Sequence, residues 1–348
     1  MSITSFIKRK FLGRVQQKIK EKKEEKKFLS DYNTFLQAGE TPHETYMSFI
    51  NLYCSTNGRL NENVHQKIKE TNPPVKVADK LEGIAGTFTT SDFKNINNEL
   101  EEKGYVKFEK KLSQDIIDKI YNYALQTGAK IPPDYNTKIV YDPSNPVSEI
   151  YRFDIQDLIN NPEIQTLIMD PVLINVARNY LQCEPIFDFP ALWWSTSFSK
   201  EASSEAAQLY HFDMDRIKWL KIFFYITDVS ENNGPHCYIE GSHKPGNKPD
   251  SLLKRGYARI SDEDLKPYYK SESFKVLCAD AGTIFAGDTK CWHKGSPLLN
   301  GHRLAFELEY TSSLFGANIP KMQVKNASPM FRDFCMNNKI YASNIELI

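Results

Sequence analysis

Residues 186–311 constrain the fold more than any other part of the chain. Five runs of apolar, aromatic and β-branched residues lie there, at residues 186–198, 219–229, 274–278, 283–285 and 304–311. Clusters of turn-forming residues, such as Glu231–Pro235 and Gly241–Gly246, separate the runs. Short strands divided by Gly- and Pro-containing turns are typical of a β-sandwich or a β-barrel. We therefore expect this half of the chain to form a core made mainly of strands.

The first half of the chain shows helical periodicity instead. Apolar spacing predicts one strand at residues 104–108 and helices at residues 43–54, 62–70, 91–103, 113–128, 155–160 and 171–181. The expected fold class is therefore α+β, with a mainly β core flanked by helices. We expect four parts, namely a basic amphipathic helix at 1–27, a helical extension at 28–87, a folded domain at 88–316 and a C-terminal tail at 317–348.

The charge of the chain is unevenly distributed, although the 348 residues carry no formal net charge. Residues 1–27 contain ten Lys or Arg and three Glu, a net charge of +7, which leaves −7 for the remainder. Apolar residues recur there every four positions, which predicts a helix with a lysine-rich opposite face. These residues are Ile3, Ile7, Phe11, Val15 and Ile19. The segment could pack on its own domain or on a partner, bind an anionic membrane surface, or form a disordered basic arm.

The composition argues against several classes of protein. A general nucleic-acid-binding protein would carry a basic excess, so no nucleic-acid partner is expected. No stretch approaches 18 consecutive apolar residues, and the basic N-terminal segment lacks the apolar core of a secretory signal. Six cysteines without C-x-x-C spacing indicate free thiols in a reducing compartment. We expect a cytoplasmic protein, peripheral on the inner face of a membrane if residues 1–27 bind lipid, and leave its oligomeric state open.

One group of residues has the composition of a metal site. In a strand at residues 208–215, alternation would place His211 and Asp213 on the same face. His293, which follows the strand predicted at 283–285, is the expected third ligand. Two histidines and one carboxylate leave three metal positions open, the arrangement of non-haem Fe(II) oxygenases. Zinc hydrolases use the same donors, Asp215 shares the face of Asp213, and hydrogen-bonded core histidines would also fit the pattern.

A non-haem oxygenase of this kind also needs a co-substrate, usually 2-oxoglutarate. The distal carboxylate of 2-oxoglutarate requires a buried cation with two parallel donors, and Arg303 can supply one. On the strand predicted at 304–311, Arg303, Glu307 and Glu309 fall on one face. The opposite face of this strand is apolar. The first face is therefore expected to line a site, and the second to pack in the core.

The sequence around these residues resembles the phytanoyl-CoA dioxygenase family of Fe(II)- and 2-oxoglutarate-dependent enzymes over residues 88–315. The segments that carry the resemblance are 104–125, 208–213, 220–229, 233–235, 241–244 and 282–293. The resemblance implies a double-stranded β-helix, the jelly roll of cupin type, with the iron near one mouth. It assigns the iron ligands to His211, Asp213 and His293, and the 2-oxoglutarate clamp to Arg303.

Two weaker assignments follow from the same resemblance. Ser296 is similar in position to a co-substrate hydroxyl, and Arg152 lies where some relatives have a second cationic contact. From strand alternation, Lys221 is a candidate to face the cavity, where it would form a salt bridge or bind substrate. His236 is expected either against the iron site or at a strand end. Trp193, Trp194 and Ser195 lie on a strand expected to border the site, and the two adjacent Trp cannot both face inward. His302 is expected on the face of its strand opposite to Arg303.

The expected activity is hydroxylation of an unactivated C–H bond with Fe(II), 2-oxoglutarate and O2, releasing succinate and CO2. Asp213 argues against halogenation, because halogenating relatives lack this carboxylate. Desaturation, cyclisation and epimerisation stay open, and a jelly-roll binding module without turnover is the second class of function. The substrate is expected to be a small molecule or a lipid- or glycan-linked one. Ser251–Lys270 is either a lid whose basic and aromatic residues suit an anionic or sugar-like substrate, or an ordinary solvated insertion.

Overall fold

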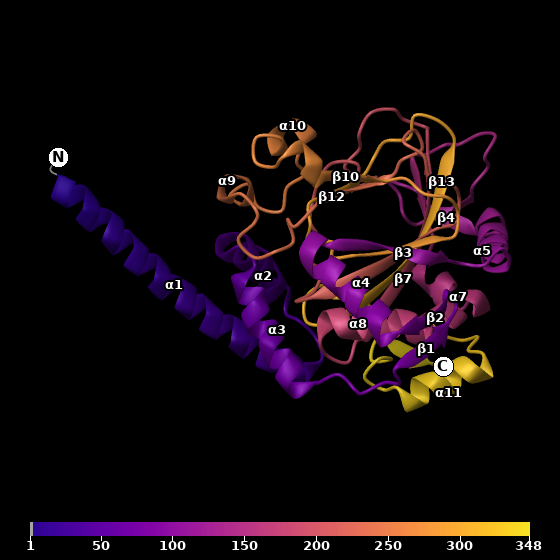
Figure 1. Cartoon of the computed structure of the whole chain (residues 1–348), viewed down its shortest axis with the longest axis horizontal. Coiled ribbons are helices and arrows are strands. Elements are labelled where there is room, and N and C mark those ends of the chain that lie inside the picture. The colour runs from indigo at the N-terminus through magenta and orange to yellow at the C-terminus, as the bar shows by residue number, and fades with distance from the viewer. Residues whose placement is uncertain (1–2) are drawn as a thin grey trace.

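The computed structural model describes the backbone of residues 3–348 and the side chains of residue 19 and of residues 22–348. The chain begins with a long helix, α1 (Ile3–Ala38), whose first half projects away from the rest of the molecule (Figure 1). The helix is longer than the segment predicted at 1–27. Most of the apolar stripe and of the basic face predicted for that segment lies outside the described side chains.

The centre of the molecule is an antiparallel sheet of eight strands in the order β3-β11-β8-β13-β7-β6-β4-β5. Its strands are β3 (Tyr105–Lys111), β4 (Gly128–Lys130), β5 (Lys138–Val140), β6 (Ile150–Arg152), β7 (Ile186–Thr196), β8 (Trp219–Tyr225), β11 (Thr283–Gly287) and β13 (His302–Thr311). A second sheet has the order β10-β9-β12, with β9 (His236–Ile239), β10 (Phe274–Leu277) and β12 (His293–Gly295). The two sheets form the double-stranded β-helix that the resemblance implies, so this prediction is confirmed.

The two faces of the main sheet pack against different parts of the molecule. On β13, alternate residues such as Leu304 and Phe306 belong to the large apolar core. The other face looks toward the second sheet, where Phe223, Phe285 and Tyr238 form a smaller apolar cluster. The rings of Phe223 and Phe285 stack with centroids 4.8 Å apart. The space between the sheets is thus only partly filled by apolar side chains, which leaves room for a site.

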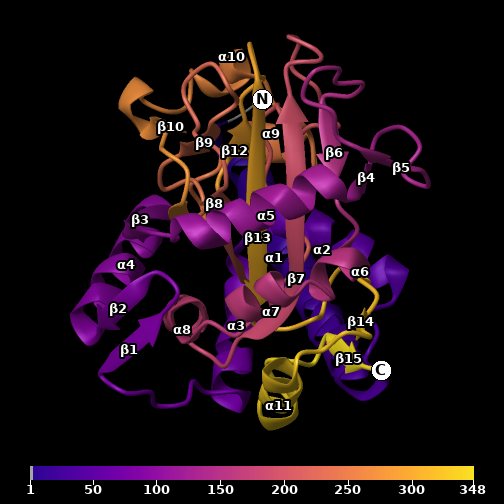
Figure 2. The same cartoon turned by 90° about the vertical axis from the view of Figure 1, so that its right-hand side faces the viewer.

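Helices cover the outer face of the main sheet. Figure 2 shows α5 (Gln114–Gln126) crossing β7 and β13, and the indole of Trp194 on β7 donates a hydrogen bond to the carbonyl of Ala124 on α5. The other helices of this layer are α4 (Thr90–Lys103), α6 (Ile155–Ile159), α7 (Pro162–Ile168) and α8 (Pro171–Leu181). Local signals start them, because Thr89 forms a capping box at α4 and Asp170 caps α8. Burying Trp194 beneath α5 leaves its neighbour Trp193 on the face of the site.

Residues 28–71 and residues 317–348 pack against this domain. The second half of α1 and the helices α2 (His43–Thr56) and α3 (Arg59–Thr71) lie along one side, and Phe28, Tyr32 and Phe35 surround Phe315 with ring centroids 5.3, 5.3 and 5.4 Å away. Residues after 316 form β14 (Met322–Val324), α11 (Pro329–Asn337) and β15 (Ile345–Leu347), which pairs in parallel with β14. The remaining hairpin is β1 (Lys80–Gly83) with β2 (Gly86–Thr89).

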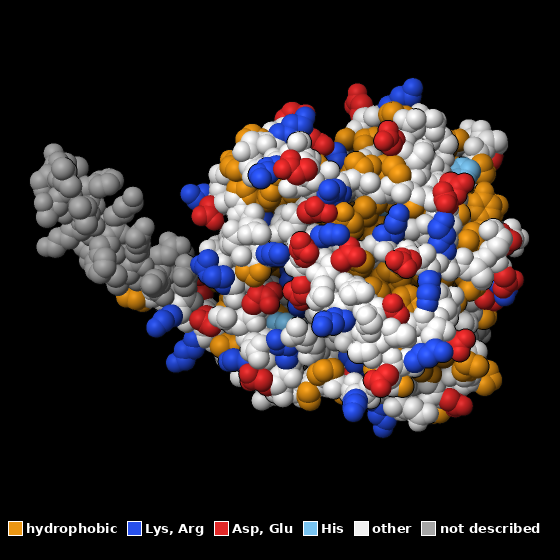
Figure 3. Space-filling view, viewed as in Figure 1, with side chains coloured by type: hydrophobic (Ala, Val, Ile, Leu, Met, Phe, Trp, Pro, Cys, Tyr) orange, Lys and Arg blue, Asp and Glu red, His pale blue; other side chains and the backbone are white. Residues whose placement is uncertain are grey.

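The surface carries both signs of charge. On the face shown in Figure 3, Lys and Arg side chains alternate with Asp and Glu over the described residues. None of the described helices is long and apolar enough to cross a membrane.

Candidate metal centre

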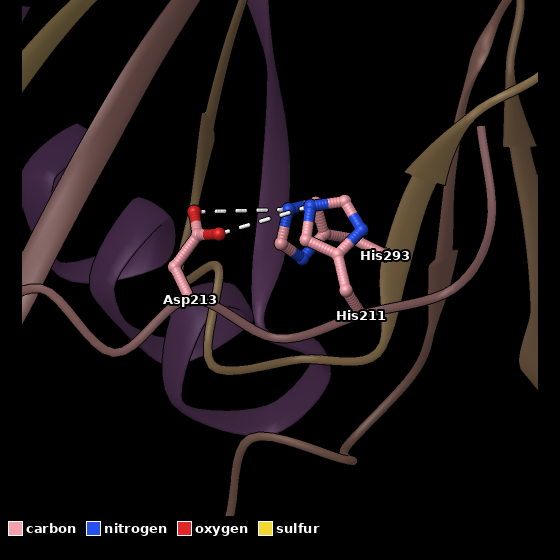
Figure 4. A group of neighbouring side chains, drawn as sticks. All are labelled: His211, Asp213 and His293. Carbon is pink, nitrogen blue, oxygen red and sulfur yellow. Dashed lines mark ion pairs between the residues drawn. The ribbon is translucent and has the colours of Figure 1, made fainter. Parts of the chain in front are cut away.

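Three side chains that are distant in sequence meet at one mouth of the barrel. His211, Asp213 and His293 each offer a ligand atom, and these atoms all lie within 4.8 Å of one another. Asp213 Oδ1 is 3.7 Å from His211 Nε2, and Asp213 Oδ2 is 3.8 Å from His293 Nε2. The carboxylate points toward both rings in Figure 4. The structure thus brings together the three residues that the sequence singled out.

The backbone around His211 differs from the predicted strand. Residues 208–215 form no continuous strand, so that prediction is wrong. Instead the backbone N–H groups of Tyr210, His211 and Asp213 donate in turn to the carbonyls of Ile260, His293 and Thr289. No regular ladder can form, because each hydrogen bond goes to a different segment. His211 and Asp213 nevertheless face the same cavity.

Both imidazoles are held in one orientation by their backbones. His211 Nδ1 lies 2.9 Å from the carbonyl oxygen of Leu209, and His293 Nδ1 lies 3.0 Å from that of Cys291. A carbonyl only accepts hydrogen bonds, so each Nδ1 carries the proton and each Nε2 presents a lone pair. Both lone pairs are directed to the side of Asp213. This is the arrangement by which a backbone carbonyl prepares a histidine to bind a metal.

The surroundings keep these donors in the protonation states that a metal requires. Burial would raise the pKa of Asp213, but the Lys221 ammonium and the two imidazoles outweigh it and hold this pKa well below its usual range. Burial lowers the pKa of His211 and of His293. At neutral pH the group therefore consists of one carboxylate and two neutral imidazoles. All three are ligands for a divalent cation without loss of a proton.

Lys221 on β8 neutralises the acidic groups around this centre. Its ammonium lies 3.0 Å from Asp213 Oδ2, 3.3 Å from Glu307 Oε1 and 3.2 Å from Glu309 Oε2. Burial disfavours the charge on Lys221, but these carboxylates outweigh it and hold the Lys221 pKa well above its usual range. Lys221 faces the cavity, as strand alternation indicates, but its charge is already paired.

Arg303 keeps its charge buried in the same cavity. Its side chain is 3% exposed, and it donates hydrogen bonds to the carbonyl of Gly234 and, over 3.0 Å, to the hydroxyl of Ser195. Its Nε has no partner, and among the described residues no carboxylate forms an ion pair with it. Gly234 adopts a φ of 79° in its turn, and a Cβ there would lie 2.4 Å from Leu298. Only glycine can therefore place this carbonyl against the guanidinium without strain.

Of the other residues predicted for the site, Arg152 lines the cavity, whereas Ser296 and Asp215 do not. Arg152 lines the cavity from an exposed position and donates a hydrogen bond over 3.1 Å to the carbonyl of Glu205. Ser296 does not line it, and its hydroxyl lies 3.2 Å from Cys237 Sγ. Asp215 is outside both the group of three ligand atoms and the cavity lining. The structure therefore gives no support to Asp215 as the rival ligand.

The cavity itself has a volume of about 290 Å³. His236 and Trp193 line it, and the hydroxyl of Tyr225 lies 3.0 Å from His236 Nδ1. Ser195 and Arg259 also contribute to the site. From the sequence, Ser195 is expected only on a strand that borders the site, and Arg259 only within the basic and aromatic segment Ser251–Lys270. The register of β7 and β13 is the signal that identifies Ser195, because it lies opposite Arg303.

The fold and this site define the class of protein, a jelly-roll oxygenase of the non-haem type. The family model of phytanoyl-CoA dioxygenase matches residues 100–304. The chain therefore belongs to the phytanoyl-CoA dioxygenase family, whose chemistry depends on Fe(II), 2-oxoglutarate and O2. A comparison with curated proteins finds no match.

Several solved structures are similar to the chain at low sequence identity. HygX from Streptomyces hygroscopicus, with nickel and 2-oxoglutarate bound, is 14% identical with a TM-score of 0.47 over 69% of this chain and 93% of that one. AviO1 from Streptomyces viridochromogenes is 15% identical with a TM-score of 0.45 over 67% of this chain and 100% of that one. EctD from S. alaskensis, with bound Fe, is 19% identical with a TM-score of 0.44 over 69% of this chain and 83% of that one.

Proposed function

We propose that this oxygenase hydroxylates an unactivated C–H bond of a small-molecule substrate, with His211, Asp213 and His293 as the iron ligands. The observation that carries the proposal is the orientation of the three donors. Two Nε2 lone pairs and one ionised carboxylate converge within 4.8 Å, at the edge of a cavity that also contains an unpaired buried arginine. Fe(II) bound there would activate O2, which is the oxidant, while 2-oxoglutarate and the substrate C–H bond would each supply two electrons.

In this proposal Arg303 binds the distal carboxylate of 2-oxoglutarate. The guanidinium is held in place by Gly234 and Ser195, and the unpartnered Nε leaves donor capacity for an anion. Because burial already removes water from the guanidinium, a carboxylate arriving there restores the hydrogen bonds and the neutrality that the site lacks. The pKa of Arg303 is lowered by burial, which is the electrostatic cost that an anion would relieve.

The barrel interior would orient the substrate and keep water out. Aromatic side chains such as Trp193 and Phe223 line the cavity beside the polar groups. A cavity of about 290 Å³ suits the reacting part of a small molecule, while the rest of a larger substrate would extend through the mouth. The balanced reaction adds one oxygen atom of O2 to the C–H bond, and the other oxidises 2-oxoglutarate to succinate and CO2.

Two experiments on the full chain test this proposal. Anaerobic protein with Fe(II) and 2-oxoglutarate is expected to show a weak visible charge-transfer band, and a screen of small molecules to find compounds that stimulate succinate formation. The Asp213→Ala variant should lose both signals, because removing the carboxylate removes a ligand.

Asp215→Asn serves as the matched control, since it alters a neighbouring carboxylate outside the group of ligand atoms. Loss of turnover in Asp215→Asn with full turnover in Asp213→Ala would transfer the ligand role to Asp215. A folded, metal-loaded protein that shows neither band nor succinate would favour the non-catalytic binding module. Hydrolysis of a screened compound by the zinc-loaded protein, without 2-oxoglutarate or O2, would favour a zinc hydrolase.

A further inference from the structure

Three arginines line the cavity, and none of them is paired with a carboxylate among the described residues. Arg303 is assigned above to the co-substrate, and Arg152 lies at the exposed rim with a hydrogen bond to the carbonyl of Glu205. The third, Arg259, comes from the segment between α9 (Asp250–Leu253) and α10 (Asp262–Leu265). Arg259 is neither one of the proposed iron ligands nor the residue proposed to bind 2-oxoglutarate, so its role is not yet assigned.

The backbone fixes Arg259 beside the metal centre. Tyr210 and Ile260 form an antiparallel bridge, with hydrogen bonds of 3.0 and 2.8 Å in the two directions. In an antiparallel register, the residue opposite His211 is then Arg259. Residues opposite each other across such a pair have Cβ atoms about 4.5–5.5 Å apart and share a face. His211 thus pairs with His293 on one side, and the register of the Tyr210–Ile260 bridge, continued by one residue, places Arg259 on its other side. Both His211 and Arg259 line the cavity.

Arg259 is free of protein partners at this position. Its Nη1 is buried without a hydrogen bond, and no ion pair involves it among the described residues. The nearby carboxylates are engaged elsewhere. Asp262 lies 2.6 Å from the ammonium of Lys294, and Asp264 lies 3.0 Å from the guanidinium of Arg255. The segment therefore presents one unpaired guanidinium to the cavity although it contains enough acids to neutralise it.

The two unpaired cations lie at different places in the cavity. Arg303 contacts the carbonyl of Gly234 and the hydroxyl of Ser195, whereas Arg259 lies on the segment that pairs beside His211. 2-Oxoglutarate has two carboxylates, of which one would reach the iron and the other Arg303. No third carboxylate of the co-substrate is left for the guanidinium next to His211.

We propose that Arg259 binds an anionic group of the substrate, a carboxylate or a phosphate, and so places the reacting carbon beside the metal centre. This inference rests on the proposed function and specifies its substrate class. The planar guanidinium offers two parallel N–H donors that match either anion. Binding at Arg259 replaces the hydrogen bonds that its buried Nη1 lacks, and it leaves the uncharged part of the substrate to the aromatic lining.

The test measures anion binding to the full chain loaded with Ni(II) and saturating 2-oxoglutarate, so that Arg303 is occupied. Inorganic phosphate and acetate are the probes, titrated by calorimetry against the wild type, Arg259→Gln and Arg259→Lys. Arg255→Gln is the matched control, because it removes an exposed arginine from the same segment. We expect about a tenfold or larger rise in Kd in Arg259→Gln, a smaller rise in Arg259→Lys and none in Arg255→Gln. The probe that binds more tightly identifies the anion class.

Three outcomes would overturn the inference: no saturable binding of either anion to the wild type, equal binding by wild type and Arg259→Gln, or a tenfold weaker 2-oxoglutarate affinity in Arg259→Gln. The third would assign Arg259 to the co-substrate. Failure of the proposed function is distinguishable, because it removes the charge-transfer band of the wild type with Fe(II) and 2-oxoglutarate. A band present in the wild type, with anion binding insensitive to Arg259, counts against the inference alone.

Discussion

Arg303 has a buried positive charge that, within the part of the chain that the structure describes, contacts only neutral oxygens. The carbonyl of Gly234 and the hydroxyl of Ser195 orient the guanidinium but do not neutralise it. By contrast, the ammonium of Lys221 is surrounded by Asp213, Glu307 and Glu309. Two cations in one cavity thus differ in availability, and only the arginine can accept an additional anion.

This difference predicts the effect of replacing Arg303. Arg303→Gln should raise the 2-oxoglutarate concentration that gives half of the charge-transfer band by about tenfold or more, since charge-assisted hydrogen bonds are lost. Arg303→Lys should give an intermediate result, because it keeps the charge and loses the fork. Lys294→Gln, at a cation already paired with Asp262, is the control. An unchanged 2-oxoglutarate affinity in Arg303→Gln would remove Arg303 from the co-substrate site.

The sequence indicated the residues of the centre, but not the contacts that complete it. His211, Asp213 and His293 were found from donor type, alternation and family resemblance, and the structure brings them together. Arg259 could not be assigned, because its position depends on a single bridge between Tyr210 and Ile260 that no local pattern encodes. The residue types that can bind a metal are visible in the sequence, whereas the pairing register between distant segments is not.

At the scale of elements, local signals decided which predictions succeeded. The helices predicted at 91–103 and 171–181 are α4 and α8, whose N-caps and apolar spacing lie within the segments themselves. The strand predicted at 304–311 is β13. The short strands β4, β5 and β12 and the helix α7 were not predicted, since three to seven residues carry too little periodicity. Pairing in the sheets stabilises the three strands.

Helix α3 contributes a pH dependence through His65. Burial, and then the ammonium groups of Lys218 and Lys290, lower the pKa of His65 to about 2, and neither ring nitrogen has a hydrogen-bond partner. The unfolded chain binds this proton near pH 6.5 and the folded protein does not. Stability is therefore fully present above pH 6.5 and falls as the pH decreases from there toward 2, by at most about 1.4 kcal/mol per pH unit.

We expect His65→Leu to lose less stability than the wild type between pH 7 and pH 5, as measured by urea unfolding at both values. The leucine fills a similar volume and removes the group that titrates. His43→Leu, at an exposed histidine at the start of α2, should follow the wild type. A parallel acid dependence in His65→Leu and the wild type would show that His65 does not contribute.

Helix α1 leads to a prediction about membranes. The exposed lysines Lys22, Lys23, Lys26 and Lys27 precede the point at which Phe28 enters the core. We expect deletion of residues 1–27 to reduce sedimentation with anionic liposomes at low salt, and little sedimentation of either protein at high salt. Replacing these four lysines by glutamine should give a partial reduction. Equal sedimentation of the full and shortened chains at low salt would contradict membrane binding by residues 1–27.

At the scale of the whole molecule, residues 317–348 belong to the same packed unit as the barrel. The hydroxyl of Tyr341 donates a hydrogen bond of 2.5 Å to the carbonyl of Ile168, and the ring stacks on Phe187 with centroids 6.0 Å apart. Asn344 donates to the carbonyl of Asp188, whose carboxylate forms a buried ion pair with Arg216. The C-terminal segment therefore stabilises the beginning of β7, at Phe187 and Asp188.

The packing of Tyr341 predicts a large cost for its removal. Tyr341→Ala should lower the free energy of unfolding by about 3–5 kcal/mol, because a buried ring and its hydrogen bond are both lost. Tyr341→Phe should cost only about 1 kcal/mol, the share of the hydrogen bond. Denaturant titration of the two variants measures both values. A cost below about 1 kcal/mol for Tyr341→Ala would mean that this segment is not part of the cooperative unit.

The mutual backbone hydrogen bonds of His211 and His293 have a consequence for the order of events during biosynthesis. Each residue donates its N–H to the carbonyl of the other, over 3.0 and 2.9 Å. Segments so distant in sequence meet only after the intervening chain has closed on itself, and such contacts form late. We therefore expect the three proposed iron ligands to come together only after the barrel has closed, so that iron would bind to the folded protein. A chelator should accordingly strip the metal without unfolding the protein, and the apoprotein should reload at the rate of binding rather than the rate of folding.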